Sequence, residues 1–372
     1  MPVSVSYPGV YVEELPSGVR TITGVATSIT AFVGKALRGP VNEPVTITSY
    51  GDFERAFGGL HVSLPLGYAV RDFFLNGGAQ AVIVRLYKKP AAAAGTATLE
   101  VPDLTLQAAS AGAWGMQLRA RVDKKAANDP NLAAAAQRLG VAPADVFDLT
   151  IRDGITGAIE SHLNLTTKES ARRADRVLAN ESSLARVGVA LPKDASPAKH
   201  GGAVTDVDVW TANAKSTAAK ADAADAGADS DPIGTAEYKG SAANKTGLYA
   251  LEKTDLFNLL CIAADTRNGD VPDDVYQEAM TYCAKRRALL VVDAKAGWAT
   301  VAAAQSGAAG MGLNGDAARN AAIYFPRIRQ ADAKLDGLVD TFAPAGMVAG
   351  VMARTDSQRG VWKAPAGLDA SE

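Results

Sequence analysis

The side chains that could carry out catalysis are few in this sequence and stand far apart. Its three histidines, His61, His162 and His200, fall in a loop, a β-rich region and a flexible segment. A serine hydrolase needs serine, histidine and aspartate to converge, so we expect each histidine to be solvent-facing or structurally hydrogen-bonded. The two cysteines, Cys261 and Cys283, have no CxxC spacing and are expected to be buried thiols. We therefore predict no catalytic residue and no metal ligand.

Two short stretches resemble phosphate-binding loops but lack the necessary context. GMGLNG (310–315) fits G-x-G-x-x-G, yet it follows an expected helix and precedes a strand, whereas a dinucleotide fingerprint needs the strand first. GSAANKT (240–246) has Asn244 where a Walker loop requires glycine, and no strand precedes it. The aspartates of ADAADAGADSD (221–231) do not match the spacing of a calcium-binding EF-hand. We predict that all three are connecting or solvated loops, and that the protein holds no cofactor.

The composition is that of a soluble globular chain with more than one domain. The chain has 372 residues, 48% of them hydrophobic and 21% charged, and a net charge of −2. A single core rarely grows to this length, so two or more domains are expected. The sequence lacks the basic stripe interleaved with aromatic residues that would indicate nucleic-acid binding. It also lacks an apolar run long enough to span a bilayer. We expect a protein made in the cytoplasm, with no nucleic-acid partner and no membrane insertion.

Alternating strands and helices predict an α/β domain at both ends of the chain. The strand SITAFVGKA (28–36), the helix PLGYAVRDFFLNGG (65–78) and the strand QAVIVRLY (80–87) form a βαβ unit, which implies a parallel strand pair. The pattern resumes later with the strands LFNLLCIAAD (256–265), ALLVVDA (288–294) and AAIYFPRI (321–328), a helix after Pro272, a hairpin turn at Asp336-Gly337 and a small-residue helix over 344–356. We therefore expect residues 25–90 and 251–367 to form one discontinuous α/β domain with a doubly wound, mainly parallel sheet.

Residues 91–250 follow a different pattern and predict an inserted β-rich α+β domain. MQLRARVD (116–123) and VFDLTIRD (146–153) alternate apolar and polar residues, as strands of an antiparallel sheet with one wet face do. One helix is expected over residues 169–179. The stretch AKSTAAKADAADAGADSD (214–231) has almost no large apolar residue, which predicts a mobile surface loop.

The first 24 residues predict an extended segment that fits no sheet of its own. They are rich in strand-favouring residues but are interrupted by Pro2, Pro8 and Pro16. Proline cannot donate to a sheet ladder, and no hairpin partner follows within turn distance. The residues alone favour an edge strand within the same subunit.

Several of these stretches together resemble the tail sheath proteins of contractile phages and related injection systems. The resemblance lies in SYPGVYVEELPSG (6–18), VATSITAFVGKALRGPVNEPVTITSYGDFERAFGG (25–59), QAVIVRLY, GAWGMQLRARV (112–122), AAIYFPRIRQAD (321–332) and PAGMVAGVMARTDSQRGVWKAPAG (344–367). It covers the chain except for the variable stretch of roughly 125–250. Members of this family usually continue past the equivalent of WKAPAG into a further domain, so residues 368–372 look like a truncated end.

The resemblance implies a structural subunit and not an enzyme. Such a subunit would polymerise around a tail tube, linked to its neighbours by terminal arms that add strands to their sheets, and would contract on a baseplate signal. Its partners would be other sheath subunits, the tail tube protein, and the baseplate and tail terminator proteins, and its place would be the phage tail of the virion. The implied arm residues are Val3, Val5, Tyr7, Pro8, Gly9, Val10, Tyr11, Val12, Glu13 and Glu14.

The resemblance also raises one enzymatic alternative, because the α/β domain of this family is likened to subtilisin in topology. A hydrolase of that kind needs a serine in a GTSMA-type turn before a helix. The nearest stretch here, FAPAGMVAGVMA (342–353), contains no serine. We therefore expect no hydrolase activity.

Overall fold

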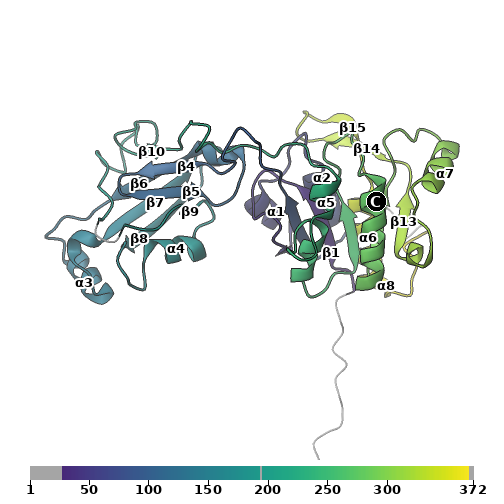
Figure 1. Cartoon of the computed structure of the whole chain (residues 1–372), viewed down its shortest axis with the longest axis horizontal. Coiled ribbons are helices and arrows are strands. Elements are labelled where there is room, and N and C mark those ends of the chain that lie inside the picture. Colours follow the sequence, from purple (N-terminus) through teal and green to yellow (C-terminus); the bar gives the residue numbers. More distant parts are fainter. Residues whose placement is uncertain (1–26, 193–194, 368–372) are drawn as a thin grey trace, which may run out of the picture.

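The chain folds into two lobes that lie side by side (Figure 1). The computed structural model describes residues 27–192 and 195–367. We call residues 27–87 and 232–367 the core lobe, and residues 88–231 the inserted lobe. The chain therefore passes from the core lobe into the inserted lobe and back again.

The core lobe is built on a six-stranded sheet in the order β13-β12-β11-β1-β3-β2. Neighbours from β13 to β3 run parallel, and only β2, at one edge, is antiparallel. The expected parallel pair of the first βαβ unit is confirmed, with Phe32 opposite Ile83. The strands are β1 (Thr30–Lys35), β2 (Val45–Ile47), β3 (Ala81–Leu86), β11 (Leu259–Ile262), β12 (Leu289–Asp293) and β13 (Ala321–Tyr324).

Helices cover both faces of this sheet, which explains why its inner strands are apolar on both sides. One face packs against α1, α2 and α8 around Phe32 and Phe73. The opposite face packs against α5 and α6 around Val33 and Tyr276. The helices of the core lobe are α1 (Tyr50–Phe57), α2 (Pro65–Leu75), α5 (Thr235–Lys239), α6 (Asp273–Arg286), α7 (Val301–Gly310) and α8 (Ala345–Arg359), with the 3₁₀ turns η3 (Gly247–Lys253) and η4 (Asp316–Asn320).

Two glycines of α8 let it lie directly on α2. A Cβ on Gly350 would stand 2.5 Å from the carbonyl oxygen of Phe73 and 2.8 Å from Cβ of Asn76. A Cβ on Gly346 would collide with the backbone of Ala69. The small-residue helix expected from the sequence therefore has a physical cause, which is backbone contact between two helices on one face of the sheet.

The inserted lobe contains two antiparallel sheets that share one core. A four-stranded sheet, β10-β6-β7-β8, packs against a three-stranded sheet, β4-β5-β9. Burial alternates strictly along β7, as its sequence predicts. The elements are β4 (Thr98–Val101), β5 (Leu104–Ala108), η1 (Ala113–Gln117), β6 (Leu118–Asp123), α3 (Pro130–Leu139), η2 (Pro143–Asp145), β7 (Phe147–Asp153), β8 (Ile159–Leu165), α4 (Ala174–Glu181), β9 (Ala185–Val187) and β10 (Thr217–Ala218).

The structure differs from the sequence-based expectations at the return to the core lobe. Ile233, Tyr238 and Leu248 all belong to the core around the parallel sheet. The core lobe therefore resumes near residue 232, before the boundary at 251 that strand pattern indicated. The elements α5 and η3 are too short for their apolar residues to show a helical period, so they could not be recognised from the sequence.

The low-complexity stretch 214–231, expected to be a mobile surface loop, has little regular secondary structure but is hydrogen-bonded to neighbouring segments. It contains β10 and then pairs through its backbone with residues 94–98, where Gly95 N–H donates to Ala226 O and Thr98 N–H donates to Asp225 O. Met116 Sδ accepts from Gly227 N–H. Small residues are therefore used here for close backbone packing. The helix expected over 169–179 begins only at Ala174, and α3 was not anticipated.

A hairpin sits above the carboxyl end of the parallel sheet. It consists of β14 (Ile328–Asp332) and β15 (Leu338–Phe342), which pair antiparallel. Asp336 and Gly337 both adopt positive φ, 52° and 83°, as the Asp-Gly signal for a turn predicts. The strand before it, β13, is only half-buried because it forms the edge of the sheet.

Candidate functional site

The arm residues implied by the sequence lie outside the described residues. These are Val3, Val5, Tyr7, Pro8, Gly9, Val10, Tyr11, Val12, Glu13 and Glu14. The described chain begins at Thr27, and Ser28 Oγ donates to Asp356 Oδ2 of α8 at 2.9 Å. This bond fixes the start of the described chain beside the second half of α8. The arm assignment stays a prediction.

The carboxyl end of the parallel sheet is where open α/β folds hold ligands, and here a polar cluster closes it. Arg267, in the loop after β11, lies 2.5 Å from Asp332 of β14 and 2.8 Å from Asp340 of β15. Tyr68 of α2 donates its hydroxyl to Asp332 at 2.9 Å. The guanidinium also lies over the rings of Tyr68 and Phe342, at 4.7 and 4.9 Å. The cluster fastens the hairpin to α2 and to the sheet.

Asp293, the last residue of β12, is buried beside this cluster. Its carboxylate accepts a hydrogen bond from the backbone N–H of Ala345, the first residue of α8, at 2.7 Å. Burial raises the pKa of Asp293 to about 7, although the bond from Ala345 opposes the shift. A carboxyl group at a helix N-terminus is a favourable arrangement, so Asp293 holds the start of α8 against the sheet.

The space between these groups is too small for a substrate. The cavity lined by Tyr68, Cys261, Arg267, Asp293 and Phe342 has a volume of about 20 Å³. This is room for about one water molecule, whereas ligand sites measure roughly 300–1,000 Å³. Burial also raises the pKa of the Cys261 thiol well above its usual range, which disfavours the reactive thiolate. The arrangement is a structural joint.

Among the described residues, no histidine side chain is hydrogen-bonded to a serine or aspartate side chain, although His61 lines a hollow with Ser63, Asp229 and Ser230. His61 is exposed in the loop before α2, His162 is buried on β8, and His200 is buried against β6. His200 was wrongly placed in a flexible segment: its Nδ1 accepts from Val122 N–H at 3.0 Å, and its Nε2 lies 3.0 Å from Thr217 Oγ1. Burial lowers the pKa of His200, so its role is structural.

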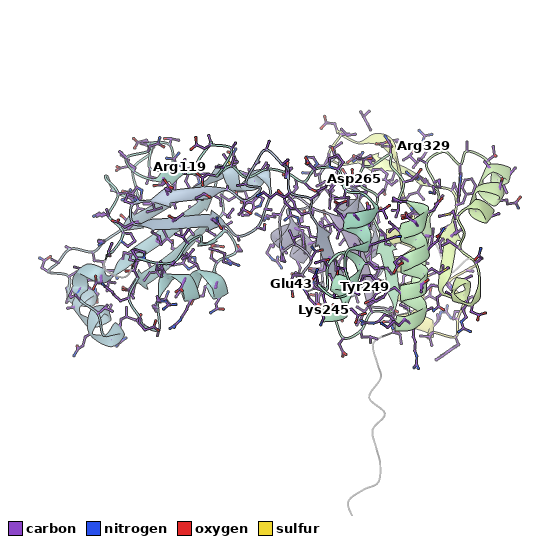
Figure 2. All side chains as sticks on the ribbon, in the orientation of Figure 1. Glu43, Arg119, Lys245, Tyr249, Asp265 and Arg329 are labelled. Atoms are coloured by element: carbon purple, nitrogen blue, oxygen red, sulfur yellow. The ribbon has the colours of Figure 1, made fainter. Side chains whose placement is uncertain are left out.

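The two phosphate-loop look-alikes are connectors in the structure. GMGLNG joins the end of α7 to η4, and the strand β13 follows it. The GSAANKT loop lies between α5 and η3, and Figure 2 shows its Lys245 on the side of the core lobe opposite Asp265, which follows β11. Neither loop therefore precedes a helix at the carboxyl end of the sheet. In the described ranges, no helix is long and apolar enough to cross a membrane.

A buried arginine helps to join the two lobes. Arg85 of β3 is 1% exposed, and its guanidinium donates to Ala36 O at 2.9 Å and to Gly39 O at 2.7 Å in the core lobe. The same guanidinium donates to Ala111 O of the inserted lobe at 2.8 Å. Burial lowers its pKa to about 10. Its guanidinium donates hydrogen bonds to carbonyl oxygens and lies over the ring of Tyr87. An arginine within an apolar strand was the visible sequence signal for this joint, and it was missed.

Neighbouring contacts reinforce the joint between the lobes. Gly39 N–H donates to Ser110 Oγ at 2.9 Å. Arg38 lies 3.4 Å from Asp153 of β7 and over the ring of Trp114, 5.7 Å from its centroid. The loop after β1 therefore contacts two separate segments of the inserted lobe, residues 110–114 and the end of β7.

The edges of the sheets decide where another chain could add a strand. The outer edge of β8 is shielded, because Arg172 Nε donates to Leu163 O at 3.0 Å and Thr166 pairs with Arg173. The edge strand β2 is three residues long. At the other edge of the large sheet, β13 pairs with β12 alone among the described strands. This four-residue edge is open to a further strand.

Solved structures of other proteins share this architecture. The sheath tail protein of Desulfitobacterium hafniense matches it with a TM-score of 0.50 and 14% identity, over 93% of this chain and 62% of that chain. This chain has the fold of a tail sheath protein. The sheath tail protein of Listeria innocua gives a TM-score of 0.49 at 14% identity, over 89% of this chain and 57% of that chain. The contracted helical sheath of the anti-feeding prophage gives a TM-score of 0.40 at 15% identity, over 98% of this chain and 57% of that chain.

Among these comparisons with known proteins, the match to sheath proteins comes from solved structures. No protein-family model and no curated protein matches the sequence. The chain spans about three-fifths of the length of the sheath tail protein from Desulfitobacterium hafniense, of which it covers 62%. Within that span the sheath fold includes the parallel sheet and the inserted lobe, since 93% of this chain takes part in the match.

Proposed function

We propose that this protein is a structural subunit of a contractile tail sheath. In this role it polymerises around a tail tube, and its contraction drives the tube through a target cell envelope. The observation that carries the proposal is the match of both lobes to a sheath tail protein over 93% of the chain. The doubly wound core would then have the subtilisin-like topology of sheath proteins, and the water-sized cavity at its carboxyl end fits a scaffold without catalytic activity.

The proposal includes the partners that such a subunit must contact. These are other copies of the sheath subunit, the tail tube protein, and the baseplate and tail terminator proteins, in the tail of a phage or phage-like particle. The joint between the lobes supports this role, because a subunit that transmits force benefits from a fixed internal geometry. The buried Arg85 and the ring contact of Arg38 with Trp114 supply that stiffness.

Residues 1 to 24 act in this proposal as an arm that adds a strand to a neighbouring subunit. Strand addition gives main-chain hydrogen bonds along the whole contact. We assign the acceptor to the half-buried edge strand β13 of the large sheet, because the opposite edge strand β2 is only three residues long and β8 of the inserted lobe is shielded. Proline at positions 2, 8 and 16 limits pairing between free arms.

Electron microscopy of the complete gene product tests the sheath function. Negatively stained preparations should show tubes, and deletion of residues 1–20 should abolish them while leaving the unfolding transition unchanged. The absence of any helical polymer, alone or with its tube protein, would overturn the sheath function. Tubes formed by the arm-deleted protein would overturn only the arm.

Cysteine cross-linking tests the acceptor edge separately. Cys261 and Cys283 are both buried, so introduced cysteines should react selectively. The pair Val10→Cys and Ile323→Cys should form a disulfide between subunits in assembled tubes, and the matched pair Val10→Cys and Val45→Cys on β2 should not. Cross-linking at β2 and not at β13 would assign the arm to the other edge without affecting the sheath proposal.

A further inference from the structure

The chain contains three Asn-Gly pairs, and their hydrogen bonding differs in the structure. They are Asn76-Gly77, Asn268-Gly269 and Asn314-Gly315. We propose that Asn314 is a site of spontaneous covalent modification, at which the asparagine deamidates to aspartate and isoaspartate in the folded protein. The inference is independent of the proposed sheath function.

The reaction needs only the chain itself and water. The backbone nitrogen of the following glycine attacks Cγ of the asparagine, a C–N bond forms, and the Cγ–Nδ2 bond breaks to release ammonia. Water then opens the resulting succinimide ring at either carbonyl group, which gives aspartate or isoaspartate. Glycine favours the attack because it has no side chain to crowd the ring. Oxidation states do not change, and no further reactant is required.

Hydrogen bonds restrain the first two pairs. Gly77 N–H donates to Phe74 O at 3.3 Å, and the side-chain amide of Asn76 donates to Asp72 O at 2.9 Å. At the second pair, Gly269 N–H donates to Thr266 O at 3.0 Å. In both pairs the attacking nitrogen is already engaged, and at Asn76 the leaving amide is held as well. Each must open locally before the ring can close.

The third pair has none of these restraints. Asn314 and Gly315 are both exposed, and within the described residues the Gly315 N–H has no hydrogen-bond acceptor. Gly315 has φ of 77°, and nothing lies within 4 Å of the position that a Cβ would occupy there. The attacking nitrogen is therefore free, and the five-membered ring has room to form. The pair lies in the loop between α7 and η4.

The modification would change the character of this surface. Residues 296–315 contain no charged side chain, and most of α7 is exposed. In Figure 1, α7 lies at the end of the core lobe away from the inserted lobe. Deamidation adds a carboxylate at the end of this uncharged stretch, two residues before Asp316, and the isoaspartyl product also lengthens the backbone by one carbon atom.

Peptide mapping by mass spectrometry tests the proposal on the native protein. After incubation at mildly alkaline pH, Asn314 should convert on the order of tenfold faster than Asn76 or Asn268, because each of those must first break a backbone hydrogen bond. In urea the three rates should converge, since all three asparagines then precede an unrestrained glycine. The variant Asn314→Asp supplies the chromatographic standard for the aspartyl product.

Two further results decide the outcome. The variant Asn314→Gln should remain unmodified at this position, because a glutamine side chain does not close the same five-membered ring, while slow conversion at the other two pairs persists. Equal rates at the three pairs in the folded protein would overturn the proposal. Conversion of Asn314 in urea but not in the native state would overturn it as well.

Discussion

The guanidinium of Arg85 donates to the carbonyl oxygen of Ala111 at 2.8 Å, and this bond links the parallel sheet of the core lobe to the inserted lobe. The same side chain binds carbonyl oxygens in the loop after β1. Solvent is excluded from the group, so its hydrogen bonds have no competitor. The relationship makes Arg85 the most sensitive residue of the joint.

Replacement of Arg85 by methionine should lower the free energy of unfolding by about 2–4 kcal/mol, because several buried carbonyl groups lose their donor at once. Urea titration monitored by tryptophan fluorescence measures this loss. The matched control is Arg55→Met, since Arg55 lies on α1 with its side chain 75% exposed, and that change should leave stability almost unaltered. Faster hydrogen exchange at residues 36–39 and 110–112 is expected for Arg85→Met only. Equal losses in the two variants would contradict a specific role for Arg85.

The two carboxylates that contact Arg267 should differ sharply in their contribution to the free energy of unfolding. The Asp332 side chain is fully buried, whereas that of Asp340 is 34% exposed. Asp332→Asn should destabilise the protein by about 3 kcal/mol, since it leaves a buried guanidinium without its closest charge. Asp340→Asn should lower the free energy of unfolding by less than about 1 kcal/mol, because water replaces the lost contact. The comparison is made by equilibrium unfolding, and a larger effect at Asp340 would contradict the burial argument.

The contact between α2 and α8 should not tolerate a single added methyl group. Gly350→Ala brings a Cβ within 2.5 Å of Phe73 O, so the helices must separate, at a cost of about 1–3 kcal/mol. Gly310→Ala, at the end of α7, meets nothing within 4 Å and should be neutral or stabilising by up to about 1 kcal/mol. Thermal unfolding of the two variants provides the measurement. A stable Gly350→Ala protein would show that the helices can move apart freely.

Asp293 should make stability depend on pH in a direction opposite to that of an ordinary paired carboxylate. Its folded-state pKa of about 7 lies above its usual value of 3.8, so the folded state retains a proton that the unfolded state releases. The stabilisation from this group is complete below the usual value and is lost as the pH rises toward 7. Between about pH 5 and about pH 8 the loss should reach roughly 3 kcal/mol.

The variant Asp293→Asn isolates this contribution from those of other titrating groups. Its amide oxygen can still accept from Ala345 N–H, but the side chain no longer titrates. The difference in unfolding free energy between the original protein and Asp293→Asn should therefore change with pH in the window between the two pKa values. A difference that stays constant across this window would show that Asp293 does not bind a proton there.

Much of the core lobe could be predicted from sequence because its signals are local. The apolar runs that contain Phe32 and Ile83, with a helix pattern between them, specify a buried parallel pair. Asp336-Gly337 marks a turn by the positive φ that both residues adopt. Each of these inferences needs only neighbouring residues.

The joints could not be predicted because they depend on contacts between distant segments. Arg267 meets Asp332 and Tyr68 only after three separate elements have packed together. The alanine-rich stretch 214–231 has the composition of a mobile loop, because the backbone hydrogen bonds that join it to residues 94–98 leave no trace in side-chain type. The role of Asp293 depends in the same way on the helix start at Ala345.

The inserted lobe enters and leaves the core lobe at one place, because Asp231 N–H donates to Lys88 O at 3.0 Å. A segment whose two ends meet in this way can be exchanged as a module, since a short turn could close the gap without displacing β3 or α5. Lobes of other sizes and shapes could therefore be grafted at this point while the parallel sheet stays intact. The core lobe thus provides a constant frame that can carry inserted lobes of different kinds.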